Sequence, residues 1–595
     1  MLNRIKTLAS LFLELGPRWS AFRLAYAFRL RTGLIRLQTP QYKWSDRPLT
    51  TWLKPTIPSD SSYATWRKTN APKFFPSVGA RSPRPDYGKN AIEESNKLLN
   101  GELKYFSHEY HKTGFPPNWH KDPITNYQLP IDLHWSQISD DSTTDIKFIW
   151  EPNRFAFVYT LVRAYAITQD EKYPQAFWRL IQDWADKNSP NTGANWKDGQ
   201  EIALRLMAWT FGFYAFIHSP STTPEQISQF IQLVAVQAER IHANIGYAIS
   251  TRSNHTISEA FGLWMVGLLF PELKDSEKYL TLGKRLLEEE AKKQIFPDGS
   301  YAMYSLNYHR FILHLYLYAI QLGELNHDTP SLRAAPFAAK QSRRVLMRLL
   351  RAGEHRPRND GRIGFSDELK NSIRNSIQFL SHLIDPTTGH MPVYGSNDGA
   401  LVLPLNNCDF TDYRPLLQLG SVITTGQPMF ESGPWDEDVY WLCVDELTAK
   451  NAKKDLKLSA LSELSGESFP NGGVYILRNT NSHTILRCTD FTSRPSHADQ
   501  LHMDLWMGSH NIAIDAGTYL YSGEGIWRNG LARTSAHNTV TVDGKDQMTM
   551  VSRFTWTNWA KGRVLKQTEN LWHGEHDGYN PVRHKRTVMA LEGDR

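Results

Sequence analysis

The sequence predicts an α+β protein with more than one domain, in which a long helical region precedes antiparallel β-structure. At 595 residues the chain is too long for one ordinary hydrophobic core. Over residues 91–425, apolar residues recur at the i, i+3, i+4 and i+7 spacing of helices. Beyond about Leu458 the apolar pattern alternates, as it does in strands. We therefore expect a lead-in of residues 1–90, a helical domain of residues 91–450 and a β-domain of residues 451–595.

The lead-in begins with a basic stretch, "MLNRIKTLASLFLELGPRWSAFRLAYAFRLRTGLIRL". Glu14 and Pro17 interrupt its longest apolar run and no small-residue cleavage site follows, so we expect no cleaved signal peptide. No run approaches the roughly twenty apolar residues of a transmembrane helix. The stretch predicts a basic amphipathic helix, which either packs on the next domain or makes peripheral contact with an anionic membrane.

The helical region consists of periodic segments separated by short linkers that contain Pro, Asn, Asp or Gly. Examples of the segments are "RFAFVYTLVRAYAIT", "GQEIALRLMAWTFGFYAFI" and "SEAFGLWMVGLLF". Short connections predict antiparallel helix pairs, which either stack as a solenoid or close into a ring. In a ring, the N-termini of the inner helices and the loops before them face one cleft, and "RSNH" precedes such a helix.

The β-region contains five stretches with strand patterns: "GGVYILRN", "HTILRCTD", "LHMDLWMGSHNIAIDAGTYLY", "HNTVTVDGKDQ" and "KGRVLKQTENLWHGEH". The tail "RHKRTVMALEGDR" predicts one more strand and the start of a turn. We therefore expect that the chain is truncated or that the neighbouring strand lies elsewhere.

Composition narrows the class of ligand. The net charge of +6 favours an acidic ligand, but no block of Lys and Arg is present, which argues against nucleic acid. Three scattered cysteines predict neither a disulfide framework nor a Cys-rich metal site. The 19 Trp and 25 Tyr residues are suited to stacking on sugar faces, although most are expected in the core.

Six motifs occur in a fixed order: "NWKDGQEIALRLMAW", "RSNHTISEAFGLW", "PDGSYAMYSLNYHRF", "SHADQLHMDLW", "IAIDAGTY" and "SAHNTVTVDG". Together they resemble the heparinase II/III family of polysaccharide lyases, from about Lys147 to the C-terminus. The resemblance implies an incomplete (α/α) toroid followed by an antiparallel β-sandwich. It also implies cleavage of a uronate-containing polysaccharide by β-elimination.

Elimination removes the C5 proton of a uronic acid, which requires that the neighbouring carboxylate be neutralised. Asn254 and His255 can supply hydrogen-bond donors for that purpose, as an oxyanion hole does; alternatively they cap a helix. In the family, the tyrosine corresponding to Tyr308 is a catalytic acid or base, and the nearby Arg310 is expected to lower its pKa. The alternative is that Tyr308 is one of several helix aromatics.

Further residues are expected at the cleft. Glu201 and Arg205 lie four apart on one helix face and can form an ion pair that either holds a sugar carboxylate or is structural. Asn195 and Trp196 could offer a hydrogen bond and a stacking surface, and Arg154 could line a subsite.

The resemblance also implies a zinc site formed by His497, Asp515 and His537. These are suitable zinc ligands, and we expect a structural ion that holds a β-domain loop against the cleft. The sequence departs from the family at Pro495, where characterised lyases often carry a histidine that faces the substrate. His502 is five residues after His497, and on a strand this odd offset would place it on the opposite face.

Three hypotheses for function follow. The first is a lyase of an acidic polysaccharide such as a glycosaminoglycan or exopolysaccharide. The second is a non-lyase protein that binds or processes glycans during cell-surface polysaccharide assembly. The third, a toroid glycoside hydrolase, requires two carboxylic acids across the cleft, for which Glu151, Glu201 and Glu259 are available. The substrate class predicts the cell envelope or periplasm, and the lack of a clear signal peptide leaves the cytoplasm as the alternative.

Overall fold

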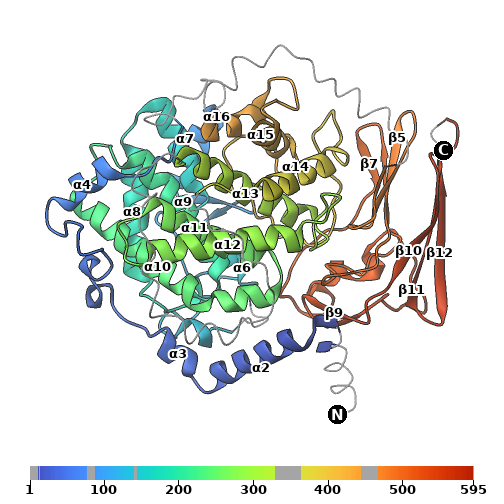
Figure 1. Cartoon of the computed structure of the whole chain (residues 1–595), viewed down its shortest axis with the longest axis horizontal. Helices are drawn as coiled ribbons and strands as arrows, with labels where there is room; N and C mark the ends of the chain where they lie inside the picture. The colour runs from blue at the N-terminus through green and yellow to red at the C-terminus, as the bar shows by residue number, and fades with distance from the viewer. Residues whose placement is uncertain are drawn as a thin grey trace.

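The computed structural model describes residues 11–12, 14–76, 88–139, 144–327, 363–443 and 467–593. Helices dominate up to Leu442 and strands dominate from Glu467, so the α+β class is confirmed. The expected domain boundary at residue 450 lies outside the described residues. Figure 1 shows the helical domain beside a β-domain.

The helical domain is a double layer of antiparallel helices. Its helices are α2 (Pro17–Arg31), α3 (Leu34–Gln38), α4 (Tyr63–Asn70), α5 (Lys89–Leu99), α6 (Lys147–Asn153), α7 (Phe157–Thr168), α8 (Lys172–Lys187), α9 (Gly199–Phe216), α10 (Pro224–Thr251), α11 (Asn254–Leu269), α12 (Ser276–Gln294), α13 (Leu306–Leu325), α14 (Asp367–Ser381), α15 (Arg414–Thr425) and α16 (Glu437–Leu442). The inner helices α9, α11 and α13 are apolar around most of their circumference and are almost wholly buried. The outer helices α8 and α14 have one apolar face each.

Glycines bring α11 and α12 close together. A Cβ on Gly283 would lie 2.5 Å from the carbonyl oxygen of Ala260, and one on Gly267 would lie 2.4 Å from the backbone nitrogen of Leu280. Both distances are too short for any side chain. The close packing holds α11 firmly, and with it the residues at its N-terminus.

The β-domain consists of two antiparallel sheets and a short hairpin. Strand order is β3-β4-β5-β6-β7 in one sheet and β10-β11-β12 in the other, with β8-β9 separate. Tyr475 and Leu486 of the first sheet pack against Trp572 of the second, which gives the domain its own core. The strands are β3 (Glu467–Phe469), β4 (Val474–Arg478), β5 (Ser482–Arg487), β6 (Met503–Met507), β7 (His510–Ala513), β8 (Thr549–Ser552), β9 (Thr555–Thr557), β10 (Gly562–Gln567), β11 (Leu571–Tyr579) and β12 (Val582–Met589).

Two features differ from the sequence prediction. The stretch "HNTVTVDGKDQ" was expected as a strand, but it forms a loop with one isolated bridge between Val542 and Lys545. The loop is held through side chains, since the Asn538 amide donates to backbone carbonyl oxygens of Met503 and Ile514. A hairpin of β1 (Glu102–Tyr105) and β2 (Glu109–Lys112) also lies within the helical domain.

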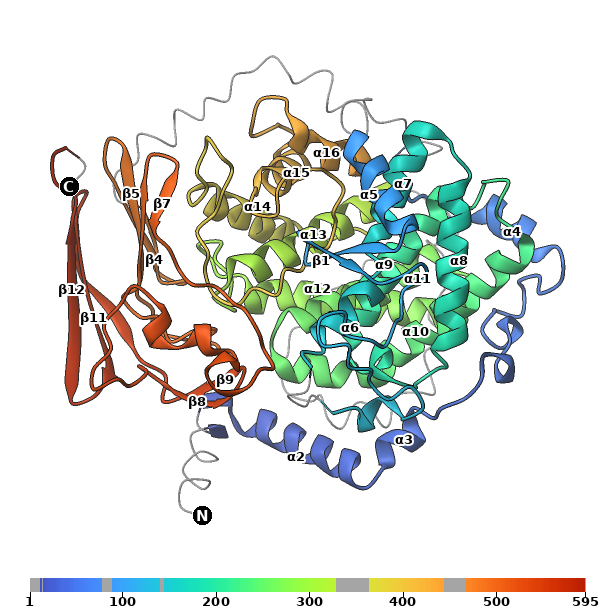
Figure 2. The ribbon, with the colours of Figure 1, turned by 180° about the vertical axis from the view of Figure 1, so that it is seen from behind.

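The lead-in wraps the outside of the helical domain. Helix α2 packs on α10 through Phe22 and Tyr26, whose rings face Gly246 and Tyr247. Both views place α2 along one edge of the molecule (Figures 1 and 2). Among the described residues, no helix is both long and apolar enough to cross a membrane.

Candidate active site

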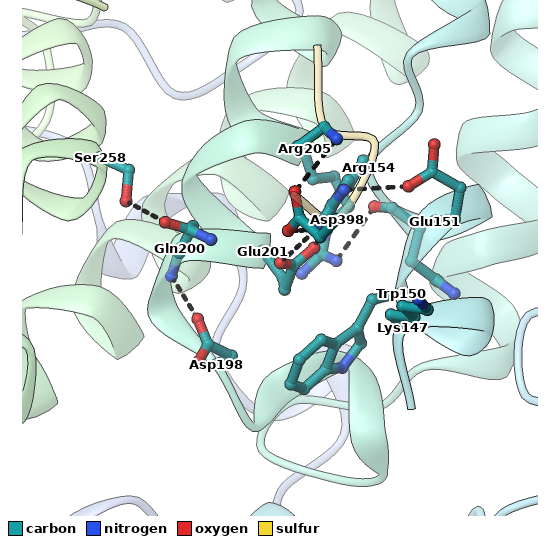
Figure 3. Close-up of polar contacts among 12 residues, drawn as sticks. Lys147, Trp150, Glu151, Arg154, Asp198, Gln200, Glu201, Arg205, Ser258 and Asp398 are labelled. Atoms are coloured by element: carbon teal, nitrogen blue, oxygen red, sulfur yellow. Dashed lines mark hydrogen bonds and ion pairs between the residues drawn. The ribbon is translucent and has the colours of Figure 1, made fainter. Parts of the chain in front are cut away.

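Asn254 and His255 occupy the first turn of α11, but they do not cap it. The N-cap residue is Ser253, whose side chain makes no capping hydrogen bond. The Asn254 amide instead donates to the Gln200 side-chain oxygen at 2.7 Å, linking α11 to the start of α9 (Figure 3 shows Gln200). The pair is therefore held by neighbouring side chains, and the capping alternative is wrong.

His255 carries a positive charge at neutral pH because of Asp198. The His255 Nδ1 lies 3.3 Å from the Asp198 carboxylate, which itself accepts the backbone N–H of Gln200 at the N-terminus of α9. Burial alone would lower the pKa of His255, but the Asp198 carboxylate outweighs burial and raises that pKa to about 9. The site thus presents an imidazolium whose side chain is about one third exposed.

A second carboxyl group, Glu259, lies one helical turn after His255. Burial first, and then repulsion from Asp198, raise the pKa of Glu259 to about 8. Gly199 leaves room for this group, since a Cβ there would lie 2.3 Å from the Glu259 carboxyl carbon. Glu259 is consequently mostly protonated at neutral pH, and Asp198 is the carboxylate that balances the His255 charge.

Tyr308 meets a second tyrosine from the β-domain. The two hydroxyls of Tyr308 and Tyr521 lie 2.9 Å apart, and both side chains are buried. Burial raises the pKa of Tyr308, as does the nearby Asp398 carboxylate. Burial is also the main reason that the pKa of Tyr521 is raised, and either hydroxyl can donate the hydrogen bond between them.

Arg154 is at the centre of an ion-pair network beside these groups (Figure 3). Its guanidinium binds Glu201 through two bonds of 2.6 and 2.8 Å, and Glu151 at 2.9 Å. Asp398, from the loop after α14, lies 3.7 Å away. Burial raises the pKa of Glu151 to about 7. The network connects α6 and α9 to the loop that borders Tyr308.

Three expected cleft residues are structural instead. Arg205 is fully buried and binds the Gln237 side chain at 2.7 Å, so the expected ion pair with Glu201 is wrong. Asn195 donates to the Trp119 carbonyl oxygen inside the core. Trp196 has no exposed surface and cannot stack on a sugar. The sequence signal was misleading because α9, which carries Arg205, is buried around almost its whole circumference, and because the turn of residues 194–196 before α9 is buried as well.

The charges near Tyr308 also differ from expectation. Arg310 points away, donates to the carbonyl oxygen of Phe410 and stacks on its ring, so the expected help for Tyr308 is wrong. The cations that lower the pKa of Tyr308 are Arg154 and Arg494. Arg494 precedes Pro495, and among the described residues it forms no hydrogen bond or ion pair. The sequence offered no signal for Tyr521, which lies in another domain.

His497, Asp515 and His537 converge in the β-domain as predicted. All three are buried, and their ligand atoms lie within 4.8 Å of one another. Neither ring nitrogen of His497 has a hydrogen-bond partner among the described residues, nor has Nε2 of His537. Burial lowers the pKa of His497 to about 3, which keeps the ring in the neutral form that binds metals. The donor set therefore fits Zn²⁺.

His502 lies beside this cluster but is not a ligand. Its Nδ1 accepts the backbone N–H of Asn538 at 3.0 Å, so the ring proton is on Nε2, which lies 4.0 Å from Asp515. The expected strand alternation does not apply, because His497 and His502 precede β6 in a loop. Nε2 of His502 has no hydrogen-bond partner among the described residues.

Comparison with known proteins agrees with this architecture. The model of the heparinase II/III N-terminus matches residues 62–381, and the heparinase II/III-like C-terminal model matches residues 463–595. The heparin-sulfate lyase of Bacteroides stercoris is 23% identical over 535 residues, which cover 85% of this chain and 67% of that protein. The heparin-sulfate lyase of Pedobacter heparinus is 28% identical over 473 residues, which cover 77% and 60%.

The chain thus spans between three fifths and two thirds of the length of these relatives. A crystal structure of heparinase III superimposes with a TM-score of 0.60 at 17% identity, covering 91% of this chain and 77% of that one. A heparinase III with methylated lysines gives a TM-score of 0.52 at 18% identity, covering 92% and 78%. These matches confirm the toroid-plus-sandwich fold, and with the two domain models they place the chain in the heparinase II/III family.

Proposed function

We propose that the chain is a polysaccharide lyase that cleaves an acidic, uronate-containing polysaccharide by β-elimination. The observation that carries the proposal is the hydrogen bond of 2.9 Å between the Tyr308 and Tyr521 hydroxyls. Arg494, which has no ion-pair partner among the described residues, lowers the pKa of Tyr308 there. In the reaction, the C5–H bond breaks and its electron pair is delocalised onto the neighbouring carboxylate as an enolate-like intermediate. That pair then forms the C4–C5 double bond as the C4–O4 bond breaks, and O4 receives a proton.

Neutralisation of the uronate carboxylate falls to the first turn of α11. His255, held as an imidazolium by Asp198, supplies a positive charge, and Asn254 supplies an amide that is fixed by Gln200. Both donors are in place before substrate binds, so they stabilise the enolate-like intermediate without reorganisation.

Tyr308 transfers the protons. Arg154 and Arg494 stabilise its ionised form, and the Tyr521 hydroxyl is within hydrogen-bond distance to donate to it. Burial keeps the pKa of Tyr308 raised overall, so little phenolate is present at neutral pH. The phenolate that forms is a strong base, and once it has taken the C5 proton the resulting phenol can donate that proton to O4. Where H5 and O4 lie on the same face of the sugar ring, one side chain removes the C5 proton and returns it to the leaving oxygen. Pro495 is compatible with this scheme because no histidine is needed.

The relatives named heparin-sulfate lyase support a glycosaminoglycan-like substrate. Arg494, which has no anionic partner among the described residues, is suited to a carboxylate or sulfate on such a chain. For the β-domain we propose that His497, Asp515 and His537 hold a zinc ion. When bound, this ion would cross-link the loop that carries Tyr521 to the loop that carries Arg494.

The hydrolase alternative fits the geometry less well. Glu151 and Glu201 both bind the one guanidinium of Arg154, and Glu259 adjoins Asp198. These carboxyl groups are engaged in pairs within the wall, whereas a hydrolase requires two that face across an open gap. A glycan-binding role without catalysis is distinguished by the experiment below.

The test is incubation with heparosan, heparan sulfate, hyaluronan, alginate and a bacterial exopolysaccharide, followed by ultraviolet absorbance of the unsaturated uronate. We expect absorbance to rise with at least one glycosaminoglycan and to disappear in Tyr308→Phe. New reducing ends without absorbance would instead indicate a hydrolase. Binding of the polymer without either product would indicate a glycan-binding protein.

A further inference from the structure

Helix α2 has two apolar faces, and only one of them is covered. Phe22 and Tyr26 form the inner face on α10. On the opposite side, Ala21, Leu24, Ala25 and Phe28 follow the i, i+3, i+4, i+7 spacing of a single helix face and are all exposed. Packing on the toroid therefore buries only some of the apolar side chains of α2, and the others remain exposed.

The uncovered residues are large and lie far out in solvent. Leu24 is 73% exposed and Phe28 is 64% exposed. The next helix, α3, continues the surface with Leu37, which is 79% exposed. Figures 1 and 2 show both helices on the outside of the molecule, along one edge. We call the exposed face of α2 together with Leu37 the apolar ridge.

Positive charge surrounds the apolar ridge. Residues 15–45 contain six basic residues and no acidic residue, so this short stretch carries a charge equal to the +6 of the whole chain. Arg18 and Arg31 border the exposed face of α2, and Arg36 follows on α3; all three are exposed. Among the described residues, none of these three arginines forms an ion pair.

We propose that the apolar ridge and its arginines dock the protein on an anionic lipid membrane. A helix that lies in the membrane interface buries its apolar side chains at the boundary between headgroups and acyl chains. Its arginines bind lipid phosphates at the same time. A second copy of the chain is a poorer occupant, because two such faces would bring together two clusters of the same charge. The surface fits a negatively charged partner that also has an apolar layer.

Docking would bring the cleft close to the membrane. The inner side of α2 contacts the end of α10, where Arg23 lies over the ring of Tyr247 at 5.1 Å. Helix α10 ends at Thr251, immediately before Asn254. A membrane bound by α2 would therefore lie next to the turn that leads into the candidate active site. A polysaccharide at the envelope surface would then be close to that site.

The test is co-sedimentation of the full chain with vesicles of phosphatidylcholine alone and of phosphatidylcholine with phosphatidylglycerol. We expect at least about tenfold stronger binding to the anionic vesicles, weakened by salt. The double variant Leu24→Glu, Phe28→Glu should lose this binding, and the triple variant Arg18→Gln, Arg31→Gln, Arg36→Gln should reduce it about tenfold or more. A matched control, Ile512→Glu with Val582→Glu, changes exposed residues of the β-domain and should bind as the wild type does.

Circular dichroism and thermal melting establish that each variant is folded. Equal binding to both kinds of vesicle, or wild-type binding by the Leu24→Glu, Phe28→Glu variant, would overturn the proposal. So would a dimer in the absence of lipid that this variant disrupts, since the ridge would then belong to a second copy. The elimination assay is run separately from the vesicle assay. The two assays together distinguish a lyase that does not bind vesicles from a vesicle-binding protein without lyase activity.

Discussion

At the scale of single residues, Tyr308 is the group on which the chemistry depends. Tyr308→Phe keeps the ring in its buried place and removes only the hydroxyl that meets Tyr521. We expect kcat to fall at least about a thousandfold, because general acid–base catalysis contributes about 10²–10⁴-fold and this residue serves both steps. Tyr316→Phe is the matched control, since its hydroxyl bonds a core carbonyl oxygen. Comparable losses in both variants would contradict the assignment.

The Asp198–His255 pair predicts a pH dependence. The wild-type rate should fall as pH rises through about 9, because His255 then loses its proton. In Asp198→Asn the helix cap is kept, but the main carboxylate facing His255 is lost, while Glu259 and Glu201 remain. The pKa of His255 should move toward the ordinary value of about 6.5, which lowers the rate about tenfold at pH 7.5.

A pH–rate profile of kcat/KM checks this shift. The two proteins should approach each other at acidic pH, where His255 is protonated in both. A basic limb at the same pH in wild type and Asp198→Asn would show that Asp198 does not hold the His255 proton.

The sequence could predict those site residues that lie close together in one motif. Asn254 and His255 are adjacent, so one motif predicts both. Arg205 and Trp196 also belong to motifs, but Arg205 is buried by the packing of α9 and Trp196 by Trp44 and Trp184. No local pattern reveals either kind of burial. Tyr521 comes from another domain, and only the fold brings it to Tyr308.

At the scale of elements, the proposed zinc ligands His497, Asp515 and His537 come from loops rather than from strands. His537→Ala should lower the zinc content from about one ion per chain to near zero, because two remaining ligands bind weakly. His510→Ala, an exposed residue of β7, is the control and should retain zinc. Elemental analysis of both purified variants decides the question, and equal zinc in the two would disprove the ligand assignment.

Close packing of α11 on α12 is testable through a glycine. A Cβ in Gly283→Ala would meet the Ala260 carbonyl oxygen at 2.5 Å, so we expect a loss of about 1–3 kcal/mol in the free energy of unfolding. Gly530→Ala has open space around it and should be nearly neutral. Urea titration followed by tryptophan fluorescence measures both. The helical periodicity of apolar residues predicted these two helices. It could not predict the distance between them, because that distance is set by glycines, which do not contribute to the apolar pattern.

At the scale of the whole molecule, the two domains form one candidate site because each supplies a tyrosine to it. The change from helical to alternating periodicity was enough to predict two domains. It could not predict that the loop of residues 491–496 lies against the helical domain, where Thr492 bonds Tyr304 and Ser496 bonds Ser396. That contact is long-range, and it places Arg494 beside Tyr308.

In the proposed function, this joint site breaks the polysaccharide by elimination. The most direct measurement is mass spectrometry of the products from a glycosaminoglycan oligosaccharide of defined length. Elimination predicts two fragments whose masses add up to that of the starting chain, one of them carrying the unsaturated uronate. Fragments that together exceed the starting mass by one water would show hydrolysis and contradict the account.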